Sequence, residues 1–237
     1  PPTKTMIASA RAAYLARRAP DYGVHVGDGA VHVDLARVRQ RKRDMVESFR
    51  SGSENGFRKL DQLDLIMGNA RFTGPHQVDV DVNEGGSRTL TAPIIAINVG
   101  TRPAVPAIDG LEHVPYYTNG SLMELANVPD HLLVLGGGYV GVEFAQMYRR
   151  FGSRVTLLQR GNQLLTGEDP DVAEALTDIL RGEGIDVWLN AEARSVETKS
   201  GHVHVSAGMN GERRDVQGSH LLVATGRQPN TDGLGLE

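Results

Sequence analysis

Short apolar runs alternate with amphipathic segments through the second half of the chain. Runs of four or five apolar residues predict buried strands, and the segments between them have helical spacing. The predicted strands cover 132–135, 155–158, 185–189 and 221–224, and the predicted helices end near Phe151 and Arg181. Strands that alternate with helices imply a parallel sheet with right-handed crossovers. Segments 192–198, 202–206 and 214–217 are predicted to form a small antiparallel meander.

The first half of the chain begins with helix-like stretches and continues with short strands. Asp34 is a predicted N-cap, and Ser51-Gly52-Ser53 is a predicted helix break. The predicted helices cover 3–18, 34–51 and 57–63, around an extended segment at 24–33; the predicted strands cover 65–67, 70–73, 78–82 and 88–99. Residues 100–110 contain Pro103 and Pro106, so we expect neither regular helix nor a central strand there.

A glycine-rich turn joins the strand at 132–135 to the helix that follows it. Residues 136–141 read Gly-Gly-Gly-Tyr-Val-Gly, which is a G-x-G-x-x-G pattern in strand–turn–helix context. In such a turn Gly136 permits the tight bend, Gly138 lets the backbone approach a pyrophosphate, and Gly141 lets helix and strand pack closely. The first-turn N–H groups can then bind phosphate oxygens. The alternative is a glycine-rich turn in an ordinary α/β domain; we predict a Rossmann-like dinucleotide-binding domain.

The end of the second strand indicates which nicotinamide nucleotide is bound. NAD-binding proteins place an acidic residue there to accept the ribose hydroxyls. Here the position is Gln159, and Arg160 follows it. Glutamine does not repel a 2′-phosphate, and arginine can pair with it. We predict NADPH as the preferred nucleotide and NADH as the second choice.

Composition narrows the function classes. The 237 residues are 40% hydrophobic and 23% charged with a formal net charge of −4, which is typical of a globular protein and gives no general attraction to nucleic acid. Arg39-Gln40-Arg41-Lys42-Arg43 is a local basic run that we interpret as the solvated face of an amphipathic helix. No apolar run approaches the ~18 residues of a membrane span. We therefore expect neither nucleic acid nor membrane as partner, and a cytoplasmic protein.

Metal and thiol chemistry have little support in the sequence. There is no cysteine, so no disulfide or thiolate metal site can form within this chain. His202 and His204 could share one strand face, but a metal needs more ligands than two imidazoles. We predict a solvated face of the meander and no metal site.

Three further segments resemble conserved motifs of the class I pyridine nucleotide–disulfide oxidoreductases. Pro2-Thr3-Lys4 is similar to the end of that family's redox motif. Residues 97–103 resemble a turn against the flavin, with Asn98 and Val99 departing from the usual residues. Residues 224–230 are similar to the turn that returns to the flavin domain. The start Pro-Thr-Lys-Thr-Met, followed by a Ser-Ala-Arg helix, is most similar to the mercuric reductase subfamily.

The resemblance implies an FAD-dependent oxidoreductase. In this family hydride passes from NAD(P)H to the flavin, and electrons pass on to a redox-active disulfide, with mercuric ion or a small-molecule disulfide as final acceptor. The implied domains are a partial FAD-binding α/β domain at 1–126, an inserted NAD(P)-binding domain at 127–218 and a return segment at 219–237. Complete members also carry a first flavin βαβ unit, redox cysteines and a dimerisation domain, so we expect an internal fragment of a homodimeric parent.

The resemblance also implies roles for individual residues. Lys4 and Glu143 would form a pair that places positive charge near the flavin; the alternatives are a surface lysine and a glutamate at a helix N-terminus. Tyr139 would cover the nicotinamide pocket, or simply pack between helix and sheet. On the FAD side the expected contacts are Lys4, Ala70, Val99, Gly100 and Thr101. On the NAD(P) side they are Gly136, Gly137, Gly138, Tyr139, Val140, Gly141, Gln159, Arg160, Ala224, Thr225, Gly226 and Arg227. For Ala70 the alternative is a buried strand alanine, and for Arg227 a solvated loop arginine.

Two other hypotheses compete with an enzyme fragment. The chain could hold a nicotinamide nucleotide without redox chemistry of its own, and we favour this for the isolated chain. A single-domain NAD(P) dehydrogenase is weaker, because it leaves the β-rich residues 64–110 unexplained. We also expect residues 1–125 to be poorly protected in isolation, whereas 130–218 could fold alone.

Overall fold

The computed structural model describes residues 2–25 and 31–236. Within them the chain forms two compact units. Unit 1 comprises residues 1–46 and 103–226, and unit 2 comprises 47–102 and 227–237. The middle of the extended segment predicted at 24–33 lies outside the described residues. The predicted domain boundaries at 126 and 218 follow a different criterion from this division and stay a prediction.

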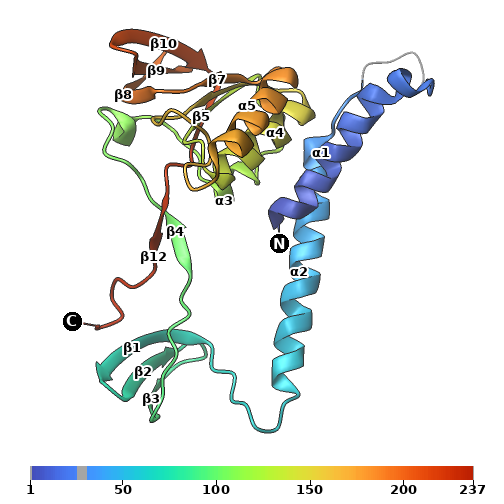
Figure 1. Ribbon diagram of the computed structural model, residues 1–237. Coiled ribbons are helices and arrows are strands. Elements are labelled where there is room, and N and C mark those ends of the chain that lie inside the picture. Colours follow the sequence, from blue (N-terminus) through green and yellow to red (C-terminus); the bar gives the residue numbers. More distant parts are fainter. Residues whose placement is uncertain (1, 26–30, 237) are drawn as a thin grey trace. The chain divides into compact units, whose positions relative to one another are not determined.

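Unit 1 is built around a four-stranded parallel sheet in the order β11-β5-β6-β7. Figure 1 labels two of its strands, β5 and β7. The four strands are β5 (His131–Leu135), β6 (Arg154–Leu158), β7 (Asp186–Trp188) and β11 (His220–Val223). Helices α4 (Tyr139–Phe151) and α5 (Pro170–Gly182) connect them. The antiparallel meander consists of β8 (Ala191–Lys199), β9 (His202–Met209) and β10 (Glu212–Gly218).

Alternation along the parallel strands produces three layers. In β5, Leu132 and Val134 join the apolar cluster that contains α4, whereas Leu133 and Leu135 join the cluster that contains the meander. Successive side chains of a strand point to opposite faces, so one buried strand supplies both clusters. The predicted α/β fold, with a parallel sheet and an antiparallel meander, is confirmed.

Helix α1 (Pro2–Arg18) packs in unit 1 with the helix layer. Met6 and Ala10 of α1 are buried in the same apolar cluster as Phe144 and Tyr148 of α4. The Tyr148 hydroxyl donates to the carbonyl of Leu122, 2.6 Å away. The remaining short elements of unit 1 are the 3-10 helices η1 (Ala19–Tyr22) and η2 (Leu111–His113) and helix α3 (Asn119–Leu122).

The basic run lies at the start of α2 (Leu35–Arg58), and its predicted solvated face is wrong at Lys42, whereas Gln40, Arg41 and Arg43 are exposed as predicted. The Lys42 side chain is buried and donates to the Glu124 carboxylate. Arg43 binds the same carboxylate at 2.6 and 2.9 Å. Arg39 donates to the main-chain carbonyl of Glu124, and Arg41 to that of Thr5. The two cations at 42 and 43 also lower the pKa of Glu124. Lys42 is therefore part of the packing, whereas Arg41 and Arg43 bind neighbouring oxygen atoms from exposed positions.

The start of α2 agrees with the prediction but its end does not, and the separate helix predicted at 57–63 is wrong, because α2 ends at Arg58 and residues 59–63 are not helical. Asp34 caps the helix, because its carboxylate accepts the backbone N–H of Arg37 at 2.9 Å. The predicted break at Ser51-Gly52-Ser53 is wrong, since the helix continues through it to Arg58. Ser51 remains in the helix with its hydroxyl donating to the Glu47 carbonyl at 2.8 Å. Among the described residues, no helix is long and apolar enough to cross a membrane.

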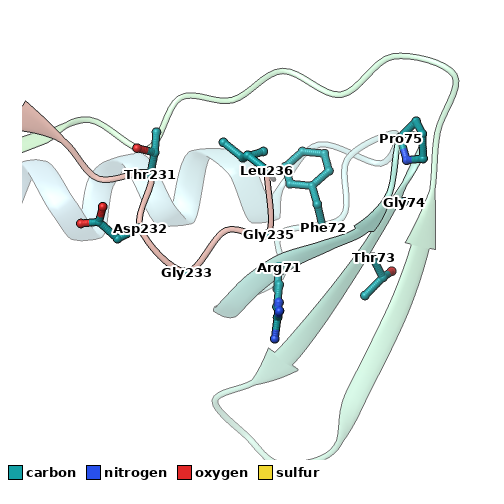
Figure 2. A pocket seen from close by; sticks show the side chains of 10 residues that line it. All are labelled: Arg71, Phe72, Thr73, Gly74, Pro75, Thr231, Asp232, Gly233, Gly235 and Leu236. Carbon is teal, nitrogen blue, oxygen red and sulfur yellow. The ribbon is translucent and has the colours of Figure 1, made fainter.

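Unit 2 contains an antiparallel sheet in the order β1-β2-β3, formed by β1 (Gly68–Gly74), β2 (Gln77–Val82) and β3 (Ser87–Thr91). Residues 65–67 and 92–99 are not strands, contrary to prediction. A two-stranded sheet pairs β4 (Thr101–Pro103) with β12 (Arg227–Pro229), which had not been predicted. The segment at 231–236 lines a hollow beside β1, where Phe72 and Leu236 lie close together (Figure 2).

Candidate nucleotide-binding site

Three glycines shape the turn between β5 and α4. Gly136 has φ +105°, a left-handed value that favours glycine, and a Cβ there would collide with the Ala224 carbonyl. A Cβ at Gly141 would collide with the carbonyl oxygen of Gly136. A Cβ at Gly138 would meet nothing within 4 Å in the part of the chain that is described. The turn is therefore closed behind Gly136 and Gly141 and open in front of Gly138.

The N-terminus of α4 faces this open side with unpaired donors. Gly138 is its N-cap, and no side chain of the described residues caps it. The first intrahelical bond runs from the Val142 N–H to the Gly138 carbonyl at 3.0 Å. The preceding first-turn N–H groups, such as those of Tyr139 and Val140, have no intrahelical acceptor. This end of the helix can accept an anion.

Gln159 and the loop after it lie against the glycine turn. The Gln159 side-chain oxygen accepts the Gly137 N–H at 2.9 Å. The Leu165 N–H donates to the Gly137 carbonyl at 2.9 Å, and buried Leu164 packs where a Cβ of Gly137 would lie. Arg160 is exposed. The predicted specificity residues are thus next to the turn, one facing it and one facing solvent.

Tyr139 is exposed, and its hydroxyl donates to the carboxylate of Glu168. Glu168 raises the pKa of this hydroxyl, because a phenolate beside a carboxylate is disfavoured. The alternative that Tyr139 packs between helix and sheet is therefore wrong.

The return turn at 224–226 lies beside the glycine turn. The Ala224 N–H donates to the Leu135 carbonyl at 2.8 Å, and Ala224 also limits the space at Gly136. The Thr225 hydroxyl donates to the Ala104 carbonyl at 3.3 Å. Two motifs separated by some 80 residues in the sequence thus meet at one end of the parallel sheet, where nucleotides bind in folds of this type.

Lys4 and Glu143 form an ion pair between α1 and α4. Glu143 lies in the second turn of α4, close in sequence to Gly141. Both side chains are partly exposed, so the pair itself contributes little to stability. The ion pair links Lys4, in the segment that resembles the end of the redox motif, to the helix that follows the glycine turn.

The other residues expected on the FAD side lie in unit 2. The Thr101 hydroxyl and carbonyl accept from the Arg227 guanidinium, each at 2.6 Å. Gly100 has φ +68°, and its carbonyl accepts the Asn230 N–H at 3.1 Å. Asn230 also donates from its side chain to the Val99 carbonyl at 3.0 Å. The turns at 97–103 and 224–230 therefore bind each other through these residues, and Arg227 is not a merely solvated arginine.

Ala70 lies in β1 opposite Val80 of β2. It is exposed, so the alternative of a buried strand alanine is wrong. His202 and His204 lie in β9, opposite Lys199 and Glu197 of β8. The described residues hold no cluster of three or more His, Cys, Asp or Glu that could bind a metal ion.

Comparison with known proteins identifies the family of this chain. The family profile described as "Pyridine nucleotide-disulphide oxidoreductase" matches residues 1–237. The chain belongs to this family. A mercuric reductase of Streptomyces lividans is 37% identical over 238 residues, covering 100% of this chain and 49% of the relative. A dihydrolipoyl dehydrogenase of Geobacillus stearothermophilus is 31% identical over 236 residues, covering 100% and 49%.

A solved structure shares the fold of this family member. The HOCl-induced flavoprotein disulfide reductase RclA from Escherichia coli superposes with a TM-score of 0.81 at 33% identity, covering 98% of this chain and 48% of that chain. The chain thus spans about half the length of the relatives that it matches. The resemblance inferred from the sequence is confirmed at the level of the family.

Leu164 and Glu168 contact the glycine turn but were missed by sequence reasoning. Both lie in the loop between β6 and α5. Leu164-Leu165 is an apolar pair within an otherwise polar loop, and this was the available signal. No local pattern indicates Glu168, because its contact with Tyr139 spans 29 positions.

Proposed function

We propose that this chain is part of an FAD-dependent oxidoreductase and that unit 1 binds its nicotinamide nucleotide. The observation that carries the proposal is the turn at 136–141, open in front of Gly138 and facing uncapped N–H groups of α4. When bound, NAD(P)H and FAD supply the hydride and electron chemistry. The chain's own residues bind the nucleotide phosphates, orient its rings and fix charge near the flavin. Domains at 1–126, 127–218 and 219–237 belong to the same proposal.

Several residues have defined tasks in this proposal. The first turn of α4 donates to the pyrophosphate, and the turn at 224–226 lines the nicotinamide side. Lys4, oriented by Glu143, keeps a positive charge near the flavin, while Ala70, Val99, Gly100 and Thr101 contact FAD. Membership in the family and similarity to flavoenzymes support these roles. The final acceptor is a mercuric ion or a disulfide, and the parent is a cytoplasmic homodimer.

We further propose that the preferred nucleotide is NADPH. The side-chain oxygen of Gln159 accepts the Gly137 N–H. Gln159 carries no charge that would repel a 2′-phosphate. Exposed Arg160 is free in the described structure to pair with that phosphate.

Binding of both nucleotides to the 237-residue chain tests this proposal. We expect saturable binding in calorimetry, tighter for NADPH than for NADH. Arg160→Ala should weaken NADPH binding by about tenfold, the usual scale for one lost charged contact, and leave NADH binding unchanged. Arg213→Ala is the matched control, because Arg213 is an exposed arginine of β10 paired with Asp215. Equal affinity for the two nucleotides would refute the preference, and no binding at all would refute the nucleotide site.

A second candidate is a nucleotide-binding module without redox chemistry of its own. The absence of cysteine from the 237 residues favours it for the isolated chain, because no thiol is present to receive electrons. Oxidation of NADPH by the isolated chain supplied with FAD and mercuric ion would exclude this candidate. For the full-length parent we expect bound flavin and NAD(P)H oxidation.

A further inference from the structure

The loop between β6 and α5 contacts the glycine turn at three points. Buried Leu164 packs against Gly137, and the Leu165 N–H donates to the Gly137 carbonyl at 2.9 Å. The third contact is the hydrogen bond from the Tyr139 hydroxyl to Glu168. Leu165 has φ +46°, a left-handed value that is uncommon for leucine. The loop is thus held firmly at its centre, beside the proposed nucleotide site.

The third contact differs from the other two in its exposure. Tyr139 is 64% exposed, and Glu168 is exposed as well. A hydrogen bond between two solvated side chains opens at little cost, whereas a buried side chain and a main-chain bond hold the loop in place. The Tyr139–Glu168 contact can therefore open and close while the loop and the turn stay together.

We propose that Glu168 is a positioning residue that restrains Tyr139 in the nucleotide-free protein, and that nucleotide binding breaks this contact. The inference rests on the proposed nucleotide site and goes beyond it. Tyr139 is the first residue of α4 and follows Gly138, in front of which the turn is open. A nucleotide that reaches these N–H groups passes the tyrosine ring. It also brings phosphate charge toward a carboxylate that Tyr139 holds at the same end of the helix.

The Tyr139–Glu168 hydrogen bond affects nucleotide affinity although Glu168 itself need not contact the nucleotide. If binding requires the open form, the apparent dissociation constant rises as the open fraction falls. A contact closed in about 80% of molecules weakens binding by about fivefold. A tyrosine hydroxyl is protonated at neutral pH and can donate to the carboxylate, and this contact raises the pKa of Tyr139 further.

A double-mutant cycle in the 237-residue chain tests this inference with NADPH as the probe. Tyr139→Phe keeps the ring and removes the donor, whereas Glu168→Ala removes the acceptor. We expect each variant to bind NADPH about fivefold more tightly than wild type, and the double variant to bind no more tightly than either. Glu174→Ala is the charge-matched control, an exposed carboxylate of α5, and should bind as wild type does.

A spectroscopic readout separates positioning from a general charge effect. With carbon-13 in the tyrosine rings, the Cζ resonance of Tyr139 should move when NADPH is added to wild type. In Glu168→Ala it should already lie near the bound position without nucleotide. Additive effects in the cycle, or single variants that bind no tighter than wild type, would overturn the inference alone. Failure of wild type to bind either nucleotide would overturn the proposed function together with it.

Discussion

The two units treat their apolar side chains differently. In unit 1 the parallel sheet is covered on both faces, and its strands alternate between two buried clusters. In unit 2, among the described residues, Val80 is the one buried apolar side chain. Phe49 and Phe57 of α2 and Leu60 beyond it are exposed there. The comparison shows that a segment can form regular secondary structure without forming a packed apolar core.

The difference has a simple physical origin. A parallel sheet needs cover on both faces, and in unit 1 α4 and the meander provide it. The sheet β1-β2-β3 has a regular antiparallel register but little to bury its side chains. Three short strands without a substantial apolar face are marginally stable in water. We therefore expect stability to be concentrated in unit 1.

Hydrogen exchange of the isolated chain should give the largest contrast between the units. Amides of β5 and α4 should open only with global unfolding, at the ~5–15 kcal/mol typical of domains. The opening free energy of amides in β1 and β2 should be at least about 3 kcal/mol smaller than that of amides in β5 and α4. Because α1 packs on α4, its amides should be protected with unit 1, which revises the boundary expected from the sequence. Equal protection of β2 and β5 would contradict the expectation that stability is concentrated in unit 1.

A matched pair of valines sharpens the same contrast. Val134 in β5 is 0% exposed and Val80 in β2 is 6% exposed, so both are buried, but in different surroundings. Val134→Ala leaves a cavity in a packed cluster and should lower the free energy of unfolding by about 1–3 kcal/mol. Val80→Ala should change that transition by less than about 0.5 kcal/mol, because unit 2 can relax around the change.

The chain's single tryptophan makes this measurable. Trp188 lies at the end of β7 and is buried in the meander-side cluster, so its fluorescence follows unit 1 during urea unfolding. Far-ultraviolet circular dichroism follows both units. If Val80→Ala shifts the Trp188 transition as much as Val134→Ala does, the two units unfold as one and the contrast is wrong.

The parts of unit 1 that were predictable carry their signals locally. The run 132–135, the glycines that follow and the apolar run 155–158 specify strand, turn and strand within some 30 residues. The same locality made the glycine turn and Gln159 identifiable as candidate site residues. The family resemblance brought in Lys4 and the turn at 224–230.

Ser51-Gly52-Ser53 has poor helix propensity, yet α2 continues through these residues, so a weak propensity did not end the helix. The other errors arose where contacts distant in the sequence decide the structure. The basic run has the pattern of a solvated face, but Lys42 is buried and pairs with Glu124, which lies some 80 positions away in the sequence. Pairing of β4 with β12 and contact of Glu168 with Tyr139 are also long-range in sequence. Periodicity contains no information on such partners.

The smallest effect is expected from pH, and it should be confined to unit 1. His131 at the start of β5 is buried. Its Nδ1 accepts from Arg154 at 2.7 Å, and its Nε2 lies 2.9 Å from the Thr156 hydroxyl. Burial lowers the pKa of His131, with Arg154 adding to it, and burial also lowers the pKa of His220. The folded protein therefore holds both rings neutral where the unfolded chain protonates them.

The sign of the pH effect follows from this difference. Below the ordinary histidine value of 6.5 the unfolded state binds more protons than the folded state, so stability falls as the pH falls. The slope for one histidine is at most about 1.4 kcal/mol per pH unit. The Trp188 transition should move to lower urea between pH 7 and pH 5. In His131→Asn, which cannot titrate, the shift should be smaller, with His220 providing the remainder. An unchanged shift in that variant would mean that protonation of His131 does not limit the stability of unit 1.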